Sequence, residues 1–393
     1  MNILFYISVI LLAGMVTAWV LKRFKFPHVT GYLIGGVLIG PAVLGIVPAD
    51  TLISLELISD VALGFIAFLI GNEFKVRQLK REGKSIVIIT FFEAMTAVGL
   101  VFAVMYFAFN QSIPFSLMIA SIAAATAPAA TLMVIRQYHA RGNLVHTLLP
   151  VVALDDVFSI ITFGIATSIS KAVIKNATPN IMNMLVFPIA EILASILLGL
   201  LAGFLVLFVL RKIRSEANYL NVLIAGVFLC IAVSIKFHLS PLLSCMTFGA
   251  TIANLLPNPQ KPVAILDHIT APIYLSFFTI SGASLNITAL THVGLIGISY
   301  FLVRFIGKWL GAFVSCKMMK KPAEVSKYLG IALMPQAGVA LGLSLTAERI
   351  IGAPYGAQIR TVILATTVVY ELLGPMMSKF ALKQAGEIKD TKS

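Results

Sequence analysis

The sequence contains very little charge. Only 11% of its 393 residues are Asp, Glu, Lys or Arg, whereas 59% are hydrophobic and the mean hydropathy is +0.98. A soluble domain has about 25% charged and about 45–50% apolar residues. This balance excludes an ordinary soluble protein, and we expect no nucleic-acid partner despite the net charge of +13. It predicts an all-α polytopic membrane protein surrounded by lipid.

Cysteine and catalytic motifs are also scarce. The three cysteines lie in apolar segments without CxxC or Cys/His spacing, which predicts neither a disulfide framework nor a structural metal site. The chain has no nucleophile elbow and no phosphate-binding loop. We therefore expect neither an enzyme nor a protein with a bound cofactor.

Long apolar runs fill the chain instead. A helix needs roughly 20 apolar residues to cross the hydrocarbon of a bilayer. The first run is followed, not preceded, by its basic residues, which is the reverse of a cleavable signal peptide. Thirteen windows of suitable length predict thirteen spans, at residues 2–21, 29–48, 53–72, 85–109, 114–135, 145–170, 181–210, 218–236, 239–256, 262–283, 288–316, 324–347 and 359–382.

The basic residues predict an orientation for these spans. Of the 29 Lys and Arg residues, 22 fall on the side of the odd-numbered loops and the C-terminal tail, and five fall on the other side. Positive residues concentrate on the cytoplasmic side. The pattern predicts a plasma-membrane or bacterial inner-membrane protein with its N-terminus outside and its C-terminus in the cytoplasm.

The predicted spans divide into two six-helix halves of opposite orientation with one linking span. Inverted repeats of this kind are common in secondary transporters. The fifth spans of the two halves correspond, since "SIAAATAPAATLMVI" (121–135) and "IALMPQAGVALGLSL" (331–345) both carry a proline among small residues. Pro128 and Pro335 predict two broken crossing helices, the second including Gln336 and Gly338. The alternative is that both prolines only kink packed helices.

Two adjacent aspartates, Asp155 and Asp156, lie inside the sixth span. A charge at the bilayer centre costs about 2.5–3.5 kcal/mol on insertion scales, so intramembrane acids indicate function. Neighbouring helical residues point about 100° apart, which lets one carboxylate face a cavity while the other meets a fixed partner. A buried pair of this kind can bind a proton or, once deprotonated, a cation.

Basic residues of the eleventh span are the candidate partners for this pair. Lys308 and Arg304 lie one turn apart on one face of the predicted helix. Either could pair with the aspartates, and Arg304 could instead pair with Glu93 of the fourth span. Lys308 could also be a lipid-facing residue that extends to the interface.

Several of these segments carry a family resemblance. "GYLIGGVLIGPAVLGI" (31–46), "LGFIAFLIGNEF" (63–74), "LDDVFS" (154–159) and "LVRFIGKWLGAF" (302–313) resemble the cation:proton antiporter-2 family. Within it, the chain is similar to NapA-type sodium/proton antiporters and to the membrane part of Kef-type potassium efflux proteins. The resemblance covers essentially the whole chain and implies the NhaA/NapA-like antiporter fold.

The resemblance implies roles for individual residues. Asp156 would carry the cation and the proton alternately, Asp155 would pair with Lys308, and Thr126 would help to line the site. Family members with two aspartates are generally electrogenic. The implied cargo is a monovalent cation, Na⁺ before Li⁺ or K⁺, exchanged for protons. The sequence does not predict a fused nucleotide-binding regulatory domain.

The resemblance also implies a homodimer whose core domain moves like an elevator beside an interface domain. The predicted boundaries are 1–82 and 215–286 for the interface domain, 83–172 and 287–385 for the core domain, 173–214 for the linking helix and 386–393 for a cytoplasmic tail.

Two other functions stay open at this point. A sodium-coupled organic-anion symporter of the bile-acid type also has crossing helices, but would not need a buried Asp–Asp pair opposite a lysine. A channel-like protein would conduct cations without moving protons in exchange.

Overall fold

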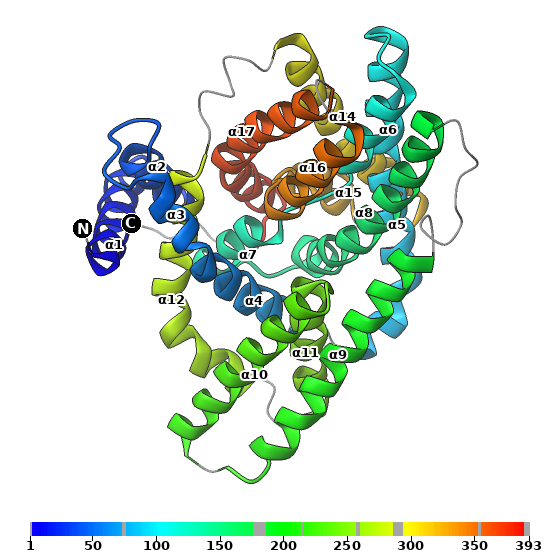
Figure 1. Cartoon of the computed structure of the whole chain (residues 1–393). Helices are drawn as coiled ribbons and strands as arrows, with labels where there is room; N and C mark the ends of the chain where they lie inside the picture. Colours follow the sequence, from blue (N-terminus) through cyan, green and yellow to red (C-terminus); the bar gives the residue numbers. More distant parts are fainter. Residues whose placement is uncertain are drawn as a thin grey trace. The chain divides into compact units, whose positions relative to one another are not determined.

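The described residues of the computed structural model are 2–72, 76–175, 186–213, 215–256, 260–285, 294–352 and 355–388. Their regular structure is helical throughout, as predicted (Figure 1). The chain forms two compact units, and each is described by itself. Unit 1 comprises Met1–Arg23, Gly31–Gly83 and Ile189–Ser284, and unit 2 comprises Phe24–Thr30, Lys84–Pro188 and Leu285–Ser393.

Unit 1 contains the N-terminal helices and a later group of four. Its helices are α1 (Ile3–Lys22), α2 (His28–Ile39), α3 (Ala49–Ser54), α4 (Glu56–Asn72), α9 (Phe187–Leu210), α10 (Glu216–Lys236), α11 (Pro241–Leu255) and α12 (Gln260–Ala283). The first three residues of α2 and the first two of α9 belong to unit 2.

Glycines bring the helices of unit 1 into backbone contact. A Cβ added at Gly249 of α11 would overlap the carbonyl oxygen of Phe68 in α4, and one at Gly71 would overlap that of Met246. Helices α2 and α12 meet in the same way at Gly36. Small residues of this kind let helices approach closely where lipid supplies no hydrophobic driving force between them.

Unit 2 contains the broken helices. Its helices are α5 (Val76–Ala103), extended by a π-helical turn over Val104–Ala108, then α6 (Ile113–Ile122), α7 (Pro128–Gln137), α8 (Asn143–Lys175), α14 (Gly294–Met318), α15 (Ala323–Ala332), α16 (Gly338–Ile351) and α17 (Tyr355–Gln384). Residues 76–83, the first turns of α5, belong to unit 1. Helix α14 separates two environments, because Leu302, Ile306 and Leu310 are exposed while Arg304 and Lys308 are fully buried.

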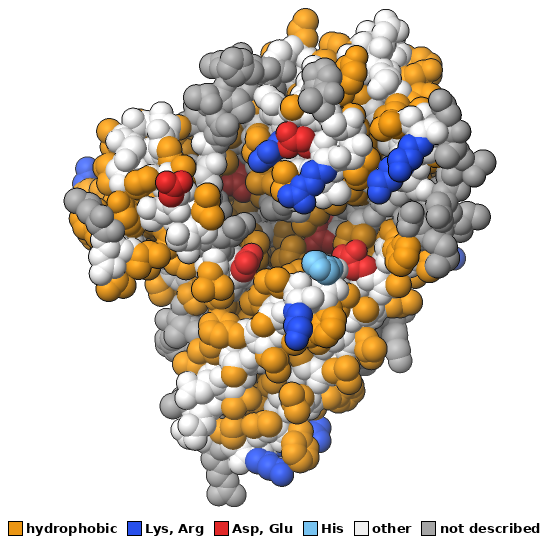
Figure 2. Space-filling model, in the orientation of Figure 1, with side chains coloured by type: hydrophobic (Ala, Val, Ile, Leu, Met, Phe, Trp, Pro, Cys, Tyr) orange, Lys and Arg blue, Asp and Glu red, His pale blue; other side chains and the backbone are white. Residues whose placement is uncertain are grey.

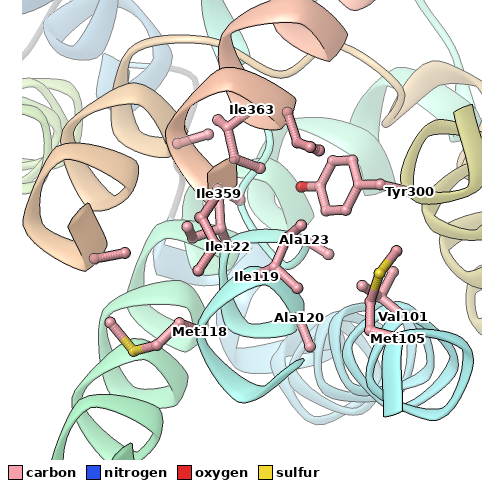
Figure 3. Packing of buried hydrophobic residues seen from close by; sticks show 14 of the residues in the cluster. Val101, Met105, Met118, Ile119, Ala120, Ile122, Ala123, Tyr300, Ile359 and Ile363 are labelled. Carbon is pink, nitrogen blue, oxygen red and sulfur yellow. The ribbon is translucent and has the colours of Figure 1, made fainter. Parts of the chain in front are cut away.

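A cluster of buried hydrophobic side chains packs around the half-helix α6. Met118, Ile119 and Ile122 of α6 belong to one cluster with Tyr300 of α14 and Ile359 of α17, and Figure 3 shows Ile122 beside Ile359. All five are essentially inaccessible to solvent. This cluster packs against α6, which is the half-helix that precedes the interruption.

Among the described residues, seven helices are long and apolar enough to cross a membrane, and four apolar helices are shorter. The short ones include α6, since a broken span contributes two half-length helices. The predicted total of thirteen spans therefore stays a prediction. The exterior supports a lipid environment: hydrophobic side chains are spread over the face in Figure 2, and Leu197, Leu201 and Phe208 of α9 are between 57% and 62% exposed.

Candidate cation and proton site

Both predicted breaks are present in unit 2. Helix α6 ends at Ile122 and α7 begins at Pro128, while α15 ends at Ala332 and α16 begins at Gly338. Alanine favours helix, so "AAATA" (123–127) does not break for lack of propensity. The cause is Pro128, which disfavours helical backbone at the preceding residue; Ala127 is accordingly extended, with φ −89° and ψ 113°.

The two interruptions contact each other directly. The Ala127 amide donates to the Pro335 carbonyl at 2.8 Å, and the Thr131 hydroxyl donates to the Ala332 carbonyl at 3.2 Å. The two predicted interruptions, at Pro128 and Pro335, are therefore in contact at one crossing although they are distant in the sequence. Non-helical backbone at membrane depth is tolerated only where protein or a water-filled cavity satisfies it.

Arg304 donates hydrogen bonds to several carbonyl groups of this non-helical backbone. Its guanidinium donates to the carbonyls of Ala123 at 3.1 Å, Ala125 at 2.7 Å and Met334 at 3.0 Å, which belong to both interruptions. The ring of Tyr370 lies 4.6 Å from the guanidinium carbon. A cation placed at helix C-termini also balances their partial negative charge, so Arg304 joins the ends of α6 and α15.

Gln336 adds a second connection between the two interruptions. Its amide nitrogen donates to the carbonyl of Ile122 at 3.0 Å, and it lies 3.0 Å from the hydroxyl of Tyr300. Gln336 and Tyr300 are both fully buried. The predicted break residue is therefore also a cap for the end of α6.

Lys308 is the centre of a buried polar network. Its Nζ donates to Asp155 Oδ2 at 3.0 Å, to Thr126 Oγ1 at 2.7 Å, and to Glu93 Oε2 and Oε1 at 2.9 and 3.2 Å. The Thr126 hydroxyl in turn donates to Asp155 Oδ2 at 2.6 Å. Four helical elements or their breaks thus contribute to one charged cluster.

One sequence hypothesis needs correction here. Glu93 does not balance Arg304, because it pairs with Lys308. The physical reason is position along α14: Gly311 packs against the backbone of Glu93, which brings Lys308 level with that carboxylate. Arg304, one turn earlier, faces the free carbonyls, for which a planar guanidinium with several donors is well suited.

Asp156 differs from its neighbour. Both of its carboxylate oxygens are buried, and neither accepts a hydrogen bond within the part of the chain that the structure describes. The Oδ1 atom of Asp155 is also without a donor there. Burying a charge without a partner is costly, so these oxygens suit a ligand that brings positive charge, namely a monovalent cation or a proton.

The sequence did not single out Tyr300, Tyr370, Gly307 or Gly311. The two glycines stand four residues apart beside Lys308, and this small-residue spacing could have indicated close packing of α14. The tyrosines carry no comparable signal, because their contacts with Gln336 and Arg304 link residues that are distant in the chain.

A buried carboxylate beside a carboxylate–lysine pair, at the crossing of two broken membrane helices, defines a secondary ion transporter of the cation:proton antiporter class. The comparisons with known proteins agree. The chain belongs to the family described as "Sodium/hydrogen exchanger, transmembrane", whose sequence profile matches residues 7–383. The resemblance to monovalent cation:proton antiporters is thereby confirmed.

Individual relatives support the same class. The chain is 24% identical over 357 residues to the Na⁺/H⁺ antiporter NhaS4 of Synechocystis sp., covering 84% of each chain. It is 33% identical to the cation/H⁺ antiporter 17 of Arabidopsis thaliana over 86 residues, which are 20% of this chain and 10% of that one. The family and these relatives do not support the organic-anion symporter.

The fold matches a solved antiporter structure. The sodium proton antiporter MjNhaP1 from Methanocaldococcus jannaschii, in its structure at pH 8, superimposes with a TM-score of 0.75 over 98% of both chains, at 18% sequence identity. An electron-microscopy map of the same antiporter gives 0.76 over 99% of both chains. At this identity the likeness shows the fold alone.

Proposed function

We propose that the chain exchanges Na⁺ for protons across a membrane, with Asp156 as the group that binds the two alternately. The observation that carries the proposal is the contrast between the two aspartates. Asp155 is held by Lys308 and Thr126, whereas the buried oxygens of Asp156 accept no hydrogen bond from the described residues.

The proposed mechanism is competition for one site. A deprotonated Asp156 attracts a cation, and the free oxygen of Asp155 and the hydroxyl of Thr126 are candidates for further oxygen ligands. Protonation of Asp156 removes the charge that holds the cation. An empty, charged carboxylate is expensive to move through hydrocarbon, so only the occupied site crosses readily, and this couples the two flows.

Na⁺ is the proposed cargo because the family is described as a sodium/hydrogen exchanger and the relative NhaS4 as a Na⁺/H⁺ antiporter. Li⁺ and K⁺ are the alternatives that the experiment ranks. We further propose that unit 2, which holds the site, is the moving core, and that unit 1 forms the interface of a homodimer. The predicted orientation, with the C-terminus in the cytoplasm, belongs to the same proposal.

The test uses purified protein in liposomes that contain a pH-sensitive dye, with Na⁺, Li⁺ or K⁺ added outside. We expect the cation to drive protons across the membrane in the wild type, and we expect no exchange from Asp156→Asn. The matched control is Glu348→Gln, which makes the same change at a partly exposed carboxylate that pairs with Arg360. Exchange of wild-type strength in Asp156→Asn would refute the assignment of the site.

A further inference from the structure

The side chain of Ser159 is a buried polar group that the proposed mechanism does not use. It lies in α8, four residues after Asp155 and three after Asp156, and it is completely inaccessible to solvent. Its hydroxyl has no hydrogen-bond partner in the part of the chain that the structure describes. Because burying an unpaired hydroxyl is costly, a group of this kind indicates either a functional role or a ligand.

Other hydroxyls of α8 form the usual local hydrogen bond. The Thr147 hydroxyl donates to the Asn143 carbonyl at 2.9 Å. The Thr162 hydroxyl donates to the Phe158 carbonyl at 2.7 Å. Each bond reaches back four residues, which is common for Ser and Thr inside helices. Ser159 makes no such bond, so its hydroxyl is not committed to the backbone of its own helix.

Helix geometry places this hydroxyl beside the two aspartates. At about 100° per residue, Ser159 lies about 40° from Asp155 and about 60° from Asp156 around the axis of α8, and therefore between them. It is about 4.5–6 Å further along that axis. Side chains of a helix lean towards its N-terminus, so the side chain of Ser159 leans towards the turn that carries the two carboxylates.

One face of α8 therefore gathers several uncommitted oxygens. They are both carboxylate oxygens of Asp156, Oδ1 of Asp155 and Oγ of Ser159. The hydroxyl of Thr126 differs, because it donates to Asp155 and accepts from Lys308. Those two bonds engage its only proton and one of its two lone pairs. Ser159 is thus better placed than Thr126 to supply a hydroxyl oxygen to a ligand.

We propose that the Ser159 hydroxyl is a ligand of the cation bound at Asp156, and that it strengthens cation binding without strengthening proton binding. This inference deepens the proposed exchange and rests on it. A cation that leaves water needs several oxygens to replace its hydration shell, whereas one carboxylate holds a proton. A hydroxyl can donate to a charged carboxylate and accept from a protonated one, so it favours neither proton state. Ser159 thereby shifts the competition towards the cation.

The first experiment measures the melting temperature of the purified protein in detergent, with Na⁺ or with the same concentration of choline. A ligand that binds only the folded state raises this temperature. Ser159→Ala removes an unpaired buried hydroxyl and introduces a strong helix former. In choline we therefore expect it to melt at or above the wild-type temperature. We expect the stabilisation by Na⁺ to require at least roughly tenfold more Na⁺ than in the wild type.

The second experiment measures the KM for Na⁺ in proteoliposomes over a series of pH values. For Ser159→Ala we expect a KM raised by at least roughly tenfold at every pH, with the maximal rate little changed. The pH at which proton competition begins to raise KM should be the same in the variant and in the wild type. Ser159→Thr keeps the hydroxyl and should restore most of the affinity for Na⁺.

The matched control is Ser170→Ala. Ser170 is another completely buried serine of α8, but it lies about four turns beyond Asp156. Its hydroxyl has a partner, the Pro114 carbonyl at 3.5 Å. We expect this variant to melt no higher than the wild type in choline and to keep the wild-type KM for Na⁺.

The outcomes separate the inference from the proposed function. A wild-type KM for Na⁺ in Ser159→Ala would overturn the role of Ser159 as a ligand and leave the exchange itself intact. A KM that is unchanged at high pH, with a displaced onset of proton competition, would show that Ser159 acts on proton binding and would also overturn the proposal. An absence of cation-driven proton movement in the wild type would refute the proposed function and the inference with it.

Discussion

Unit 1 and unit 2 are both bundles of apolar helices, but they bury different groups. In unit 1 the closest contacts are between glycines and backbone carbonyls, as at Gly249 and Gly71. All of the buried charged side chains among the described residues lie in unit 2, around two broken helices. One unit is therefore joined mainly by close packing, and the other depends on compensated charges and capped backbone.

This difference has a physical basis. Packing between small residues needs no electrostatic compensation and suits a unit that keeps one structure. A buried charge is tolerated only when it is paired or hydrogen-bonded. In a site for a transported ion, the ion itself must supply part of this pairing. The two units should therefore respond differently to substitution.

The largest effect on stability is expected at Arg304 in unit 2. Arg304→Met would leave the carbonyls of Ala123, Ala125 and Met334 without this donor, at about 1–3 kcal/mol for each unsatisfied group. We expect a loss of roughly 3–9 kcal/mol in the free energy of unfolding for the three groups together, seen as a large fall in melting temperature in detergent. Arg304→Lys should recover part of it.

The matched control is Arg360→Met. Arg360 is 44% exposed and its pair with Glu348 is near the surface, where an ion pair contributes about 0–1 kcal/mol. A melting temperature for Arg304→Met that equals that of Arg360→Met would show that the crossing does not depend on its capping arginine.

A smaller effect is expected from Gly249→Ala in unit 1. The new Cβ would overlap the carbonyl oxygen of Phe68, and separating α4 from α11 should cost about 1–3 kcal/mol. The apparent affinity for Na⁺ should stay unchanged in the folded fraction, because the substitution leaves the site in unit 2 intact. A melting curve and a transport assay on the same sample check both statements.

Gly99→Ala is the control for this substitution. A Cβ added at Gly99, in the interior of α5, would meet no atom within 4 Å apart from its chain neighbours and the backbone of its own helix. Replacing an unhindered helical glycine stabilises a helix by about 0.5–1 kcal/mol. A loss of stability in Gly99→Ala as large as that in Gly249→Ala would contradict the packing argument.

The smallest effect is expected at Glu387, three residues after the end of α17. The carboxylate of Glu387 accepts from the amides of Leu144 at 2.6 Å and Val145 at 2.9 Å, which begin α8. Glu387→Ala removes this cap from the helix that carries the aspartates, at a cost of about 0.5–2 kcal/mol. Faster hydrogen exchange confined to the first turn of α8 would be its signature, and unchanged exchange there would argue against the cap.

The sequence indicated which residues gather at the crossing better than it indicated how they pair, and their role in ion binding stays a prediction. Pro128 and Pro335 indicated the breaks because proline acts on its own helix. Asp155, Asp156 and Lys308 were recognisable because a charge is conspicuous in an apolar span. The partner of Arg304 was not predictable, since the free carbonyls exist only after both helices have broken and crossed.

Local chemistry thus determined the class of this protein: long apolar helices, two proline breaks, and acids and bases at membrane depth. The tertiary structure alone decided which groups meet. Arg304 and Lys308 are four positions apart on one helix, yet the first binds backbone carbonyls and the second binds Glu93, Thr126 and Asp155. The reason is geometric, because Gly307 and Gly311 set how closely α14 approaches α5, and this approach is a property of two helices rather than of either sequence.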